Sequence, residues 1–150
     1  FGMPFNEVIL FGIGTNIAAG FGAFAFSFIE DKVGSKKIII FSLFIMIIFG
    51  LGILIVNEKS IFWILGISLS TFFGPIQSAS RVYFAKFVPE KKKTEFFGFY
   101  SLSGKITSFL GPMLFALLTS IFHSQRAGMS IVIFFLFFGL FLMFFVKSDK

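Results

Sequence analysis

Five apolar stretches limit what this chain can fold into. They cover residues 8–29, 38–56, 61–85, 96–122 and 129–146. Each is close to or above the ~20 residues that a helix needs to cross the hydrocarbon core of a bilayer. Lipid offers the backbone no hydrogen-bond partners, so these segments are expected to be α-helices, and residues 134–138 lack the alternating polarity of a transmembrane β-strand. The sequence therefore predicts an all-α, polytopic bundle of transmembrane helices.

Composition agrees with lipid as the solvent for most of the surface. Only 13% of the residues are charged, whereas a soluble domain averages about 25%, and 28 of the 150 residues are Phe. The absence of cysteine excludes disulfides, thiolate metal sites and a cysteine nucleophile. No residue set matches a metal site or a catalytic triad, so we expect no cofactor, no metal and no enzymatic activity. The net charge of +6 falls in loops between spans, which favours membrane topology over nucleic-acid binding.

The basic residues predict the orientation in the membrane. One side of the predicted topology carries Lys32, Lys36, Lys37, Arg81, Lys86, Lys91, Lys92, Lys93, Lys147 and Lys150. The other side carries only Lys59 and Arg126. Because cytoplasmic loops are enriched in Lys and Arg, we expect loops 30–37 and 86–95 and the C-terminus in the cytoplasm. The chain begins at Phe1 rather than Met, so we expect it to be a fragment, and no targeting sequence can be read from it.

The predicted helices are of two kinds. The second and fifth are apolar on every face, which predicts that they lie at the periphery against lipid. The other three carry small residues at a spacing of four, which lets helix backbones approach closely. These stripes are Gly14/Ala18/Gly22, Ala19/Ala23/Ser27, Gly66/Ser70/Gly74/Ser78 and Gly104/Ser108.

The same three helices hold the polar groups and two Gly-Pro pairs. Polar side chains within a membrane usually face the bundle interior or a water-filled cavity. Proline removes a helix hydrogen bond, so Gly74-Pro75 and Gly111-Pro112 are expected to interrupt the third and fourth helices. The polar groups are Thr15, Asn16, Thr71, Gln77, Ser80, Tyr100, Ser101, Ser103, Lys105 and Thr107.

The charged loop between the first two spans carries a recognisable pattern. It reads as a small residue, three residues, Asp, Lys, any residue, Gly and then basic residues: Ser27, Asp31, Lys32, Gly34, Lys36 and Lys37. This pattern resembles the cytoplasmic loop motif of the major facilitator superfamily, which lies between the second and third helices and is repeated more loosely between the eighth and ninth. Ser27 stands where the motif usually has Gly, and Ser35 where it often has Arg.

Four further stretches resemble the vacuole-effluxer-like branch of that superfamily, which includes fungal vacuolar amino-acid effluxers and their bacterial relatives. They are residues 74–81 (GPIQSASR), 84–89 (FAKFVP), 95–105 (EFFGFYSLSGK) and 110–112 (LGP). The resemblance implies that the five spans correspond to helices eight to twelve of a twelve-helix transporter. Residues 1–150 would then be part of its C-terminal six-helix half, with the N-terminal half as partner.

The resemblance implies a secondary active transporter that moves small polar solutes by alternating access. Amino acids are the leading solute class, and the bacterial inner (plasma) membrane is the implied location. The competing interpretation is a non-transporting helical membrane subunit that assembles with a partner. In that case the small-residue stripes would be contacts between subunits.

For the loop motif, the resemblance implies a gating role. Asp31 would make a charge-relay contact that holds one gating state, and a solvated loop charge is the alternative. Gly34 is expected to supply a left-handed turn between the helices. Lys36 and Lys37 open the second helix against its dipole, and attraction to anionic lipid, at about 1 kcal/mol per basic residue, can offset that cost.

The candidate residues of a solute cavity are Asn16, Gln77, Tyr100, Ser103 and Lys105. Three roles are open for Lys105: a buried cation that meets a solute carboxylate or a coupling acid, a lysine that snorkels to the interface, and a structural ion pair. Arg81 lies near the cytoplasmic end and can face the same cavity, a phospholipid or a loop. Glu95 can pair with Arg81 or a nearby Lys, but we favour a role as an N-terminal anion of the fourth helix. His123 is expected to be a loop residue.

Overall fold

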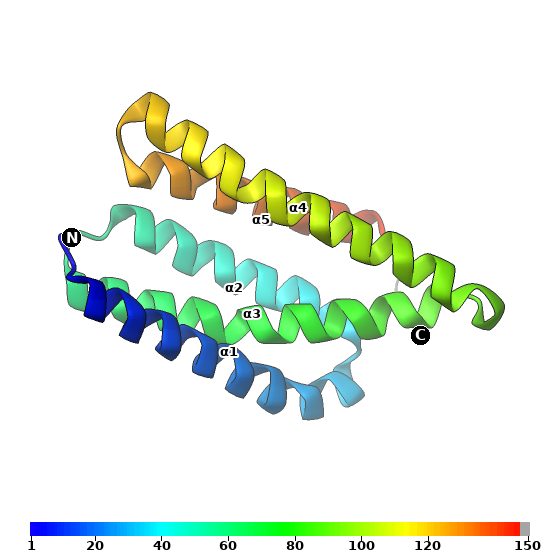
Figure 1. Cartoon of the computed structure of the whole chain (residues 1–150). Coiled ribbons are helices and arrows are strands. Elements are labelled where there is room, and N and C mark those ends of the chain that lie inside the picture. The colour runs from blue at the N-terminus through cyan, green and yellow to red at the C-terminus, as the bar shows by residue number, and fades with distance from the viewer. Residues whose placement is uncertain (148–150) are drawn as a thin grey trace.

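The computed structural model describes residues 1–147 and is helical almost throughout (Figure 1). The helices are α1 (Phe5–Val33), α2 (Ser35–Ile55), α3 (Lys59–Phe87), the short 3₁₀ helix η1 (Glu90–Lys92), α4 (Lys93–Phe122) and α5 (Gln125–Phe145). Within the described residues, five helices are long and apolar enough to cross a membrane, and they contain the predicted spans to within one residue. The all-α prediction is confirmed, and the chain is a multi-pass integral membrane segment.

The helices run side by side and alternate in direction, so their connections gather at two ends (Figure 1). At one end, which we call the hinge end, α1 meets α2 at Gly34 and α3 meets α4 at residues 88–92. At the opposite, far end, α2 meets α3 and α4 meets α5. The two basic loops therefore share the hinge end, as the charge count predicts. Lys150, which was counted with them, lies outside the described residues.

The small-residue stripes of α1 and α3 bring these two helices into backbone contact. A Cβ atom added at Gly22 would overlap the carbonyl oxygen of Thr71, and one added at Gly74 would overlap the carbonyl oxygen of Ala19. The predicted close approach is thus found between α1 and α3. In contrast, a Cβ at Gly104 of α4 would meet nothing within 4 Å among the described residues.

The two prolines do not interrupt their helices, which corrects the prediction for Gly74-Pro75 and Gly111-Pro112. α3 is continuous through Pro75, and α4 is continuous through Pro112. A proline inside a helix removes one amide donor and crowds the carbonyl four residues earlier. For Pro75 that carbonyl belongs to Thr71, and it is the group against which Gly22 packs.

The predicted lipid-facing position of the second helix is wrong for one face of α2. Ile38, Ile39 and Leu43 are buried and form a core with Ala79 and Tyr83 of α3. The opposite face of α2 is exposed, with Phe41, Phe44 and Ile48. Uniform apolarity permits burial as readily as lipid contact, so the sequence could not distinguish the two. α5 agrees better with the prediction, because its phenylalanines are largely exposed.

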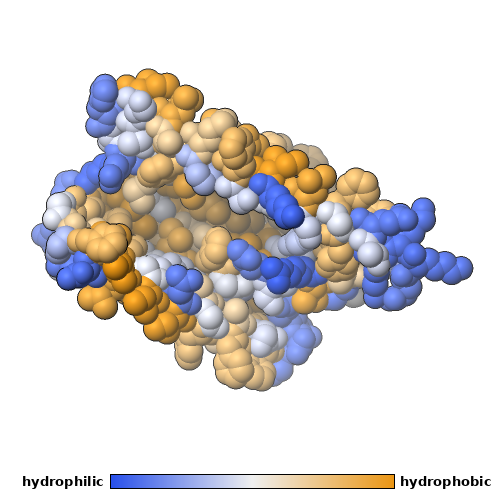
Figure 2. Space-filling view, viewed as in Figure 1, coloured by the Kyte–Doolittle hydropathy of each residue, from blue (hydrophilic) through white to orange (hydrophobic). Residues whose placement is uncertain are grey.

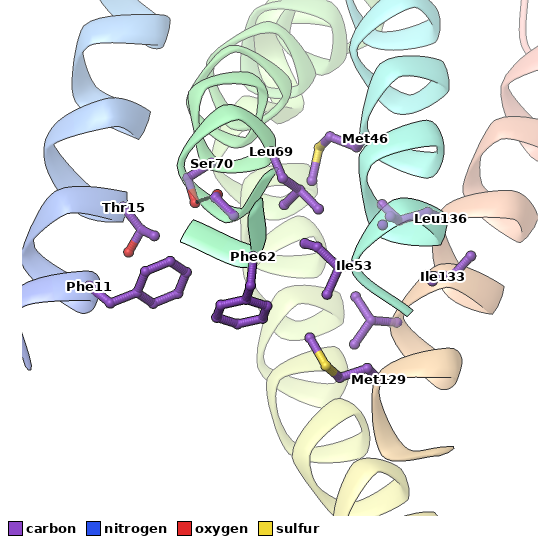
Figure 3. A pocket seen from close by; sticks show the side chains of 13 residues that line it. Phe11, Thr15, Met46, Ile53, Phe62, Leu69, Ser70, Met129, Ile133 and Leu136 are labelled. Atoms are coloured by element: carbon purple, nitrogen blue, oxygen red, sulfur yellow. Dashed lines mark hydrogen bonds between the residues drawn. The ribbon is translucent and has the colours of Figure 1, made fainter. Parts of the chain in front are cut away.

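An apolar cavity of about 220 Å³ lies between α1, α2, α3 and α5 (Figure 3). Phe11, Phe62 and Met129 stand on its walls, with two hydroxyl residues beside them. The Thr15 hydroxyl donates to the Gly12 carbonyl at 2.9 Å, and the Ser70 hydroxyl donates to the Gly66 carbonyl at 2.8 Å. Because both hydroxyl protons are used within their own helices, this cavity is poorly suited to a polar solute.

The turn from α1 to α2 is built around Gly34, whose φ of 94° explains the need for glycine. Glu30 and Ser35 on its two sides are both buried. The Ser35 hydroxyl donates to Glu30 Oε1 at 2.6 Å. The expected left-handed turn is found only in part: φ of Gly34 is positive, but its ψ of 146° lies outside the left-handed helical region. The bond across the turn fixes the end of α1 to the start of α2.

Substitution of Ser35 by Ala is expected to destabilise the protein by about 1–3 kcal/mol, because a buried carboxylate would lose a hydrogen bond. Ser42 is the matched control: it is fully buried on the same helix, but its hydroxyl has no hydrogen-bond partner. Ser42→Ala should be neutral or slightly stabilising. Thermal unfolding of the intact protein in detergent measures both variants, and equal effects would contradict the role of the bond.

Side chains fasten α5 to the rest of the bundle at both ends. At the hinge end, the Lys36 ammonium donates to the Val146 carbonyl and the Tyr83 hydroxyl donates to the Lys147 carbonyl. At the far end, the Arg126 guanidinium donates to the carbonyls of Leu54 and Val56 at 3.1 and 2.6 Å. A cation at the C-terminus of α2 is also favoured by the helix dipole. These bonds orient the α4–α5 hairpin against α2.

Candidate functional site

A polar groove lies between α3 and α4. Figure 2 shows the hollowed face of the molecule, with hydrophilic residues on both sides of the hollow. The groove has a volume of about 990 Å³. Its lining residues are Phe73, Ile76, Gln77, Ser80, Arg81, Phe97, Tyr100, Ser101, Ser103, Gly104, Lys105, Thr107 and Ser108.

Four of the five predicted cavity residues line this groove, namely Gln77, Tyr100, Ser103 and Lys105, and Arg81 joins them. The fifth, Asn16, does not line it. The Asn16 amide donates to the Gly12 carbonyl of its own helix at 2.8 Å. Among the described residues, α2 and α5 contribute no side chain to the groove.

Aromatic contacts set the geometry of the groove at the hinge end. The ring of Phe84 on α3 lies 5.4 Å from that of Phe97 and 5.0 Å from that of Tyr100 on α4, between centroids. Aromatic pairs at such distances stabilise a contact beyond the area they bury. Figure 1 shows that α3 and α4 are close at this end and diverge toward the far end. The groove is therefore a wedge that the aromatic contacts close at one end.

Several hydroxyls in the groove are already used by α4 itself. Ser103 donates to the Tyr100 carbonyl at 2.8 Å, and Thr107 donates to the Ser103 carbonyl at 2.9 Å. Ser108 donates to the Lys105 carbonyl at 2.8 Å. Hydroxyls in this state can still accept a hydrogen bond but have no proton to offer. The donors that the groove can offer to a solute come chiefly from other side chains.

Gln77, Arg81 and Lys105 are the amide and charged donors among them. All three are exposed to the groove, and none forms a hydrogen bond or an ion pair with another residue in the described part of the chain. Gln77 and Arg81 stand one turn apart on α3, and Lys105 faces the same space from α4. An open polar wall in an otherwise apolar bundle can bind a small polar solute through amide, guanidinium and ammonium donors.

The residues of the loop motif lie together at the hinge end. Asp31, Lys32 and Lys37 are exposed, and Asp31 has no ion-pair partner in the described part of the chain. Ser27 donates to the Phe24 carbonyl at 2.7 Å, and Lys36 holds the end of α5. The acid that is buried at this turn is Glu30, which sequence reasoning missed. The one sequence feature that could have indicated a buried Glu30 is Ser35, a hydroxyl residue directly after the expected turn glycine.

Glu95 and His123 lie where the sequence placed them, whereas the role of Arg126 was not predicted. Glu95 lies in the first turn of α4, where a negative charge is favourable. His123 ends α4 in the left-handed region, with φ of 49°. The capping role of Arg126 was missed, because the sequence only placed it in a loop beside α5. Its donors also reach Asn57 Oδ1 at 2.7 Å, which no sequence spacing indicates.

Comparison with known families decides the affiliation of this helical bundle. The family model described as "Vacuole effluxer Atg22 like" matches residues 1–150. The chain belongs to this family. A match to an effluxer family agrees with the expectation of a membrane protein that is not an enzyme.

Two relatives support the assignment. The chain is 42% identical over 89 residues to the uncharacterised MFS-type transporter YxiO of Bacillus subtilis, and this match covers 59% of the chain and 21% of that protein. It is 32% identical over 80 residues to autophagy-related protein 22 of Kluyveromyces lactis, and this match covers 53% of the chain and 16% of that protein. The chain thus matches about a fifth or less of the length of these relatives. No solved structure matches it.

Proposed function

We propose that the chain is part of a secondary active transporter that moves small polar solutes across a membrane by alternating access. The observation that carries this proposal is the polar groove between α3 and α4, in a chain that exposes many large apolar side chains. Its affiliation with an effluxer family and its likeness to a protein named as an MFS-type transporter support the same function. Amino acids are the solute class that we propose first.

In this proposal, residues 1–150 correspond to helices eight to twelve, and the N-terminal half of the same transporter completes the solute site. Gln77, Tyr100, Ser103 and Lys105 would contribute polar groups from α3 and α4. Asn16 would contribute only after it leaves the Gly12 carbonyl. The hollow is open on the face that Figure 2 shows, and in this proposal the N-terminal half covers that face.

The proposed orientation places the hinge end in the cytoplasm, because both basic loops lie there. The proposed location is a bacterial inner membrane. At this end Asp31, which is exposed and unpaired in the described part of the chain, would make the gating contact with the other half. A cysteine placed at Lys92 should be labelled by a membrane-impermeant thiol reagent only after the cell membrane is opened.

Transport is tested with the intact protein in liposomes. Radiolabelled leucine, glutamate and lysine should be offered separately, and at least one should accumulate above the level in protein-free liposomes. If neither these three amino acids nor any member of a wider amino-acid panel is taken up, transport of amino acids is contradicted.

The alternative, a non-transporting subunit, is favoured by one observation. The Gly104/Ser108 stripe of α4 contacts no helix in the described part of the chain, and such a stripe is typical of a helix interface. Under this interpretation a separate protein, rather than the N-terminal half of the same chain, would cover the stripe. Crosslinking from a cysteine at Ser108 would distinguish the two, because the product would be intermolecular for a subunit and intramolecular for a transporter.

A further inference from the structure

We propose that Arg81 and Lys105 form an anion-binding site near the hinge end of the groove between α3 and α4. This inference rests on the proposed transport function and specifies its solute class. The groove would take solutes that carry a carboxylate or another anionic oxygen group. The proposal follows from the charges on the groove wall, their lack of partners and their depth along the helices.

The charges on the groove wall are all of one sign. Arg81 and Lys105 line it, and no Asp or Glu is among its lining residues. The acids of the adjoining segments are Glu90, which pairs with Lys93, and Glu95, which is exposed in the first turn of α4 and does not line the groove. Two cations beside an apolar bundle attract anions, since field lines are focused in a cleft with low-dielectric walls.

Both cations lack a partner within the described residues. Neither side chain forms an ion pair or a hydrogen bond there, whereas Lys36, Lys59, Lys93 and Arg126 all do. A charged group near a membrane interior is costly unless it is paired or hydrated. An anionic solute would satisfy both cations, and the planar guanidinium of Arg81 could hold a carboxylate in two-point fashion.

Helix lengths place the two cations near the hinge end of the groove rather than at its centre. α2 and α5 each have 21 residues, about 31 Å at 1.5 Å per residue, which matches the hydrocarbon core. α3 and α4 have 29 and 30 residues, and their far ends join α2 and α5 through short turns. Their excess length therefore extends beyond the hinge end, as Figure 1 shows.

On this scale Arg81 lies roughly 33 Å along α3 from Lys59, level with the start of α2. Lys105 lies roughly 25 Å along α4 from Phe122, about one turn inside the same level. The deeper part of the groove is neutral: Gln77 is one turn further in on α3, and Thr107 and Ser108 follow Lys105 on α4. A bound solute would thus place its anionic group beside the two cations, near the closed end of the groove, and the rest of the solute beside uncharged groups. The ammonium of an amino acid would need an acid from elsewhere in the protein.

The test measures binding and transport separately on the intact protein. Binding of radiolabelled L-glutamate, citrate, L-leucine and L-lysine is measured in detergent. At least one of the two anions should bind more tightly than leucine and lysine, and its affinity should fall as salt is added. Arg81→Gln and Lys105→Gln should each weaken this binding about tenfold or more, since each removes a charge-assisted hydrogen bond.

Three controls make the result specific. Lys92→Gln removes the same charge at an exposed position that does not line the groove, and it should leave binding within about twofold. Arg81→Lys and Lys105→Arg keep the charge and should lose less binding than the corresponding glutamine variants, which separates loss of charge from misfolding. Failure of both anions to bind, unchanged binding in both glutamine variants, or an equal loss in Lys92→Gln would overturn the proposal.

A lipid headgroup could supply the same anionic chemistry, so the test includes it. The protein is purified with phosphatidylglycerol and examined by native mass spectrometry. Retained lipid that is lost in Arg81→Gln and Lys105→Gln, and that glutamate and citrate do not displace, would assign the anion-binding site to lipid and overturn the solute proposal. Anion binding without transport in liposomes would support the anion-binding site but contradict transport. Transport that does not discriminate by charge would support transport but overturn the anion-binding site.

Discussion

Replacement of Gly74 by Ala is expected to destabilise the protein by about 3 kcal/mol, at the upper end of the usual cost of overpacking. A single methyl group is enough, because a Cβ at this position would overlap the carbonyl oxygen of Ala19. A side chain could turn away, but a helix backbone cannot. The variant can fold only if α1 and α3 move apart, which would loosen the most extensive helix contact in the bundle.

Gly22 presents the reciprocal case and should respond similarly. Its added Cβ would overlap the Thr71 carbonyl oxygen, which Pro75 deprives of its usual amide donor. Close approach of Gly22 places its Cα–H groups near this carbonyl and offers a weak hydrogen bond in place of the missing one. Gly22→Ala would therefore also lose that compensation.

The matched control is Gly20→Ala on α1, where an added Cβ meets nothing within 4 Å. Because Ala favours helix by about 1 kcal/mol over Gly, this variant should be neutral or stabilising. Thermal unfolding and size-exclusion profiles of the intact protein in detergent compare the three variants. Gly74→Ala and Gly22→Ala that unfold at the same temperature as Gly20→Ala would show that the α1–α3 contact is not as close as described here.

Replacement of Gly104 by Trp is expected to reduce transport to the level of protein-free liposomes. Gly104 lines the groove between α3 and α4, and its missing side chain faces open space. An added Cβ at Gly104 meets nothing within 4 Å in the described part of the chain, and an indole would extend from it into the space through which the solute must pass. The expected loss is therefore one of function with little loss of stability.

Gly139→Trp provides the control for the added bulk. Gly139 lies on α5, an added Cβ there also meets nothing within 4 Å, and the residue does not line the groove. This variant should transport at the level of the unmodified protein. Full transport by Gly104→Trp, or equal loss in both variants, would contradict the assignment of the groove as the solute path.

Much of the fold could be predicted from the sequence because lipid imposes simple rules. The spans follow from the lengths of apolar stretches, and the shared end of the basic loops follows from where Lys and Arg fall. The contact of α1 with α3 was indicated by glycines at a spacing of four, although their partner helix was not. Gly34 was predicted because only glycine readily adopts its positive φ.

Other features depend on residues that are distant in the sequence. Asp31 was expected to be the important acid of the hinge, but Glu30 is the one that is buried, because the rotation of α1 turns it toward Ser35. The Thr71 carbonyl, which Pro75 leaves without its usual amide donor, faces Gly22 of another helix. Arg126 caps α2 only because α5 begins beside the end of that helix.

The sequence by itself determined that lipid surrounds most of the chain, how many spans it forms, and at which end of the bundle positive charge gathers. These properties depend on hydropathy, length and composition, which each segment carries alone. Only the tertiary structure decided which polar faces meet. Gln77 and Arg81 share a groove with Lys105, and Asn16 does not, because that outcome depends on how each helix is rotated and packed. An apolar face is stable both in lipid and in a protein core, so its sequence does not determine which of the two it contacts, as α2 demonstrates.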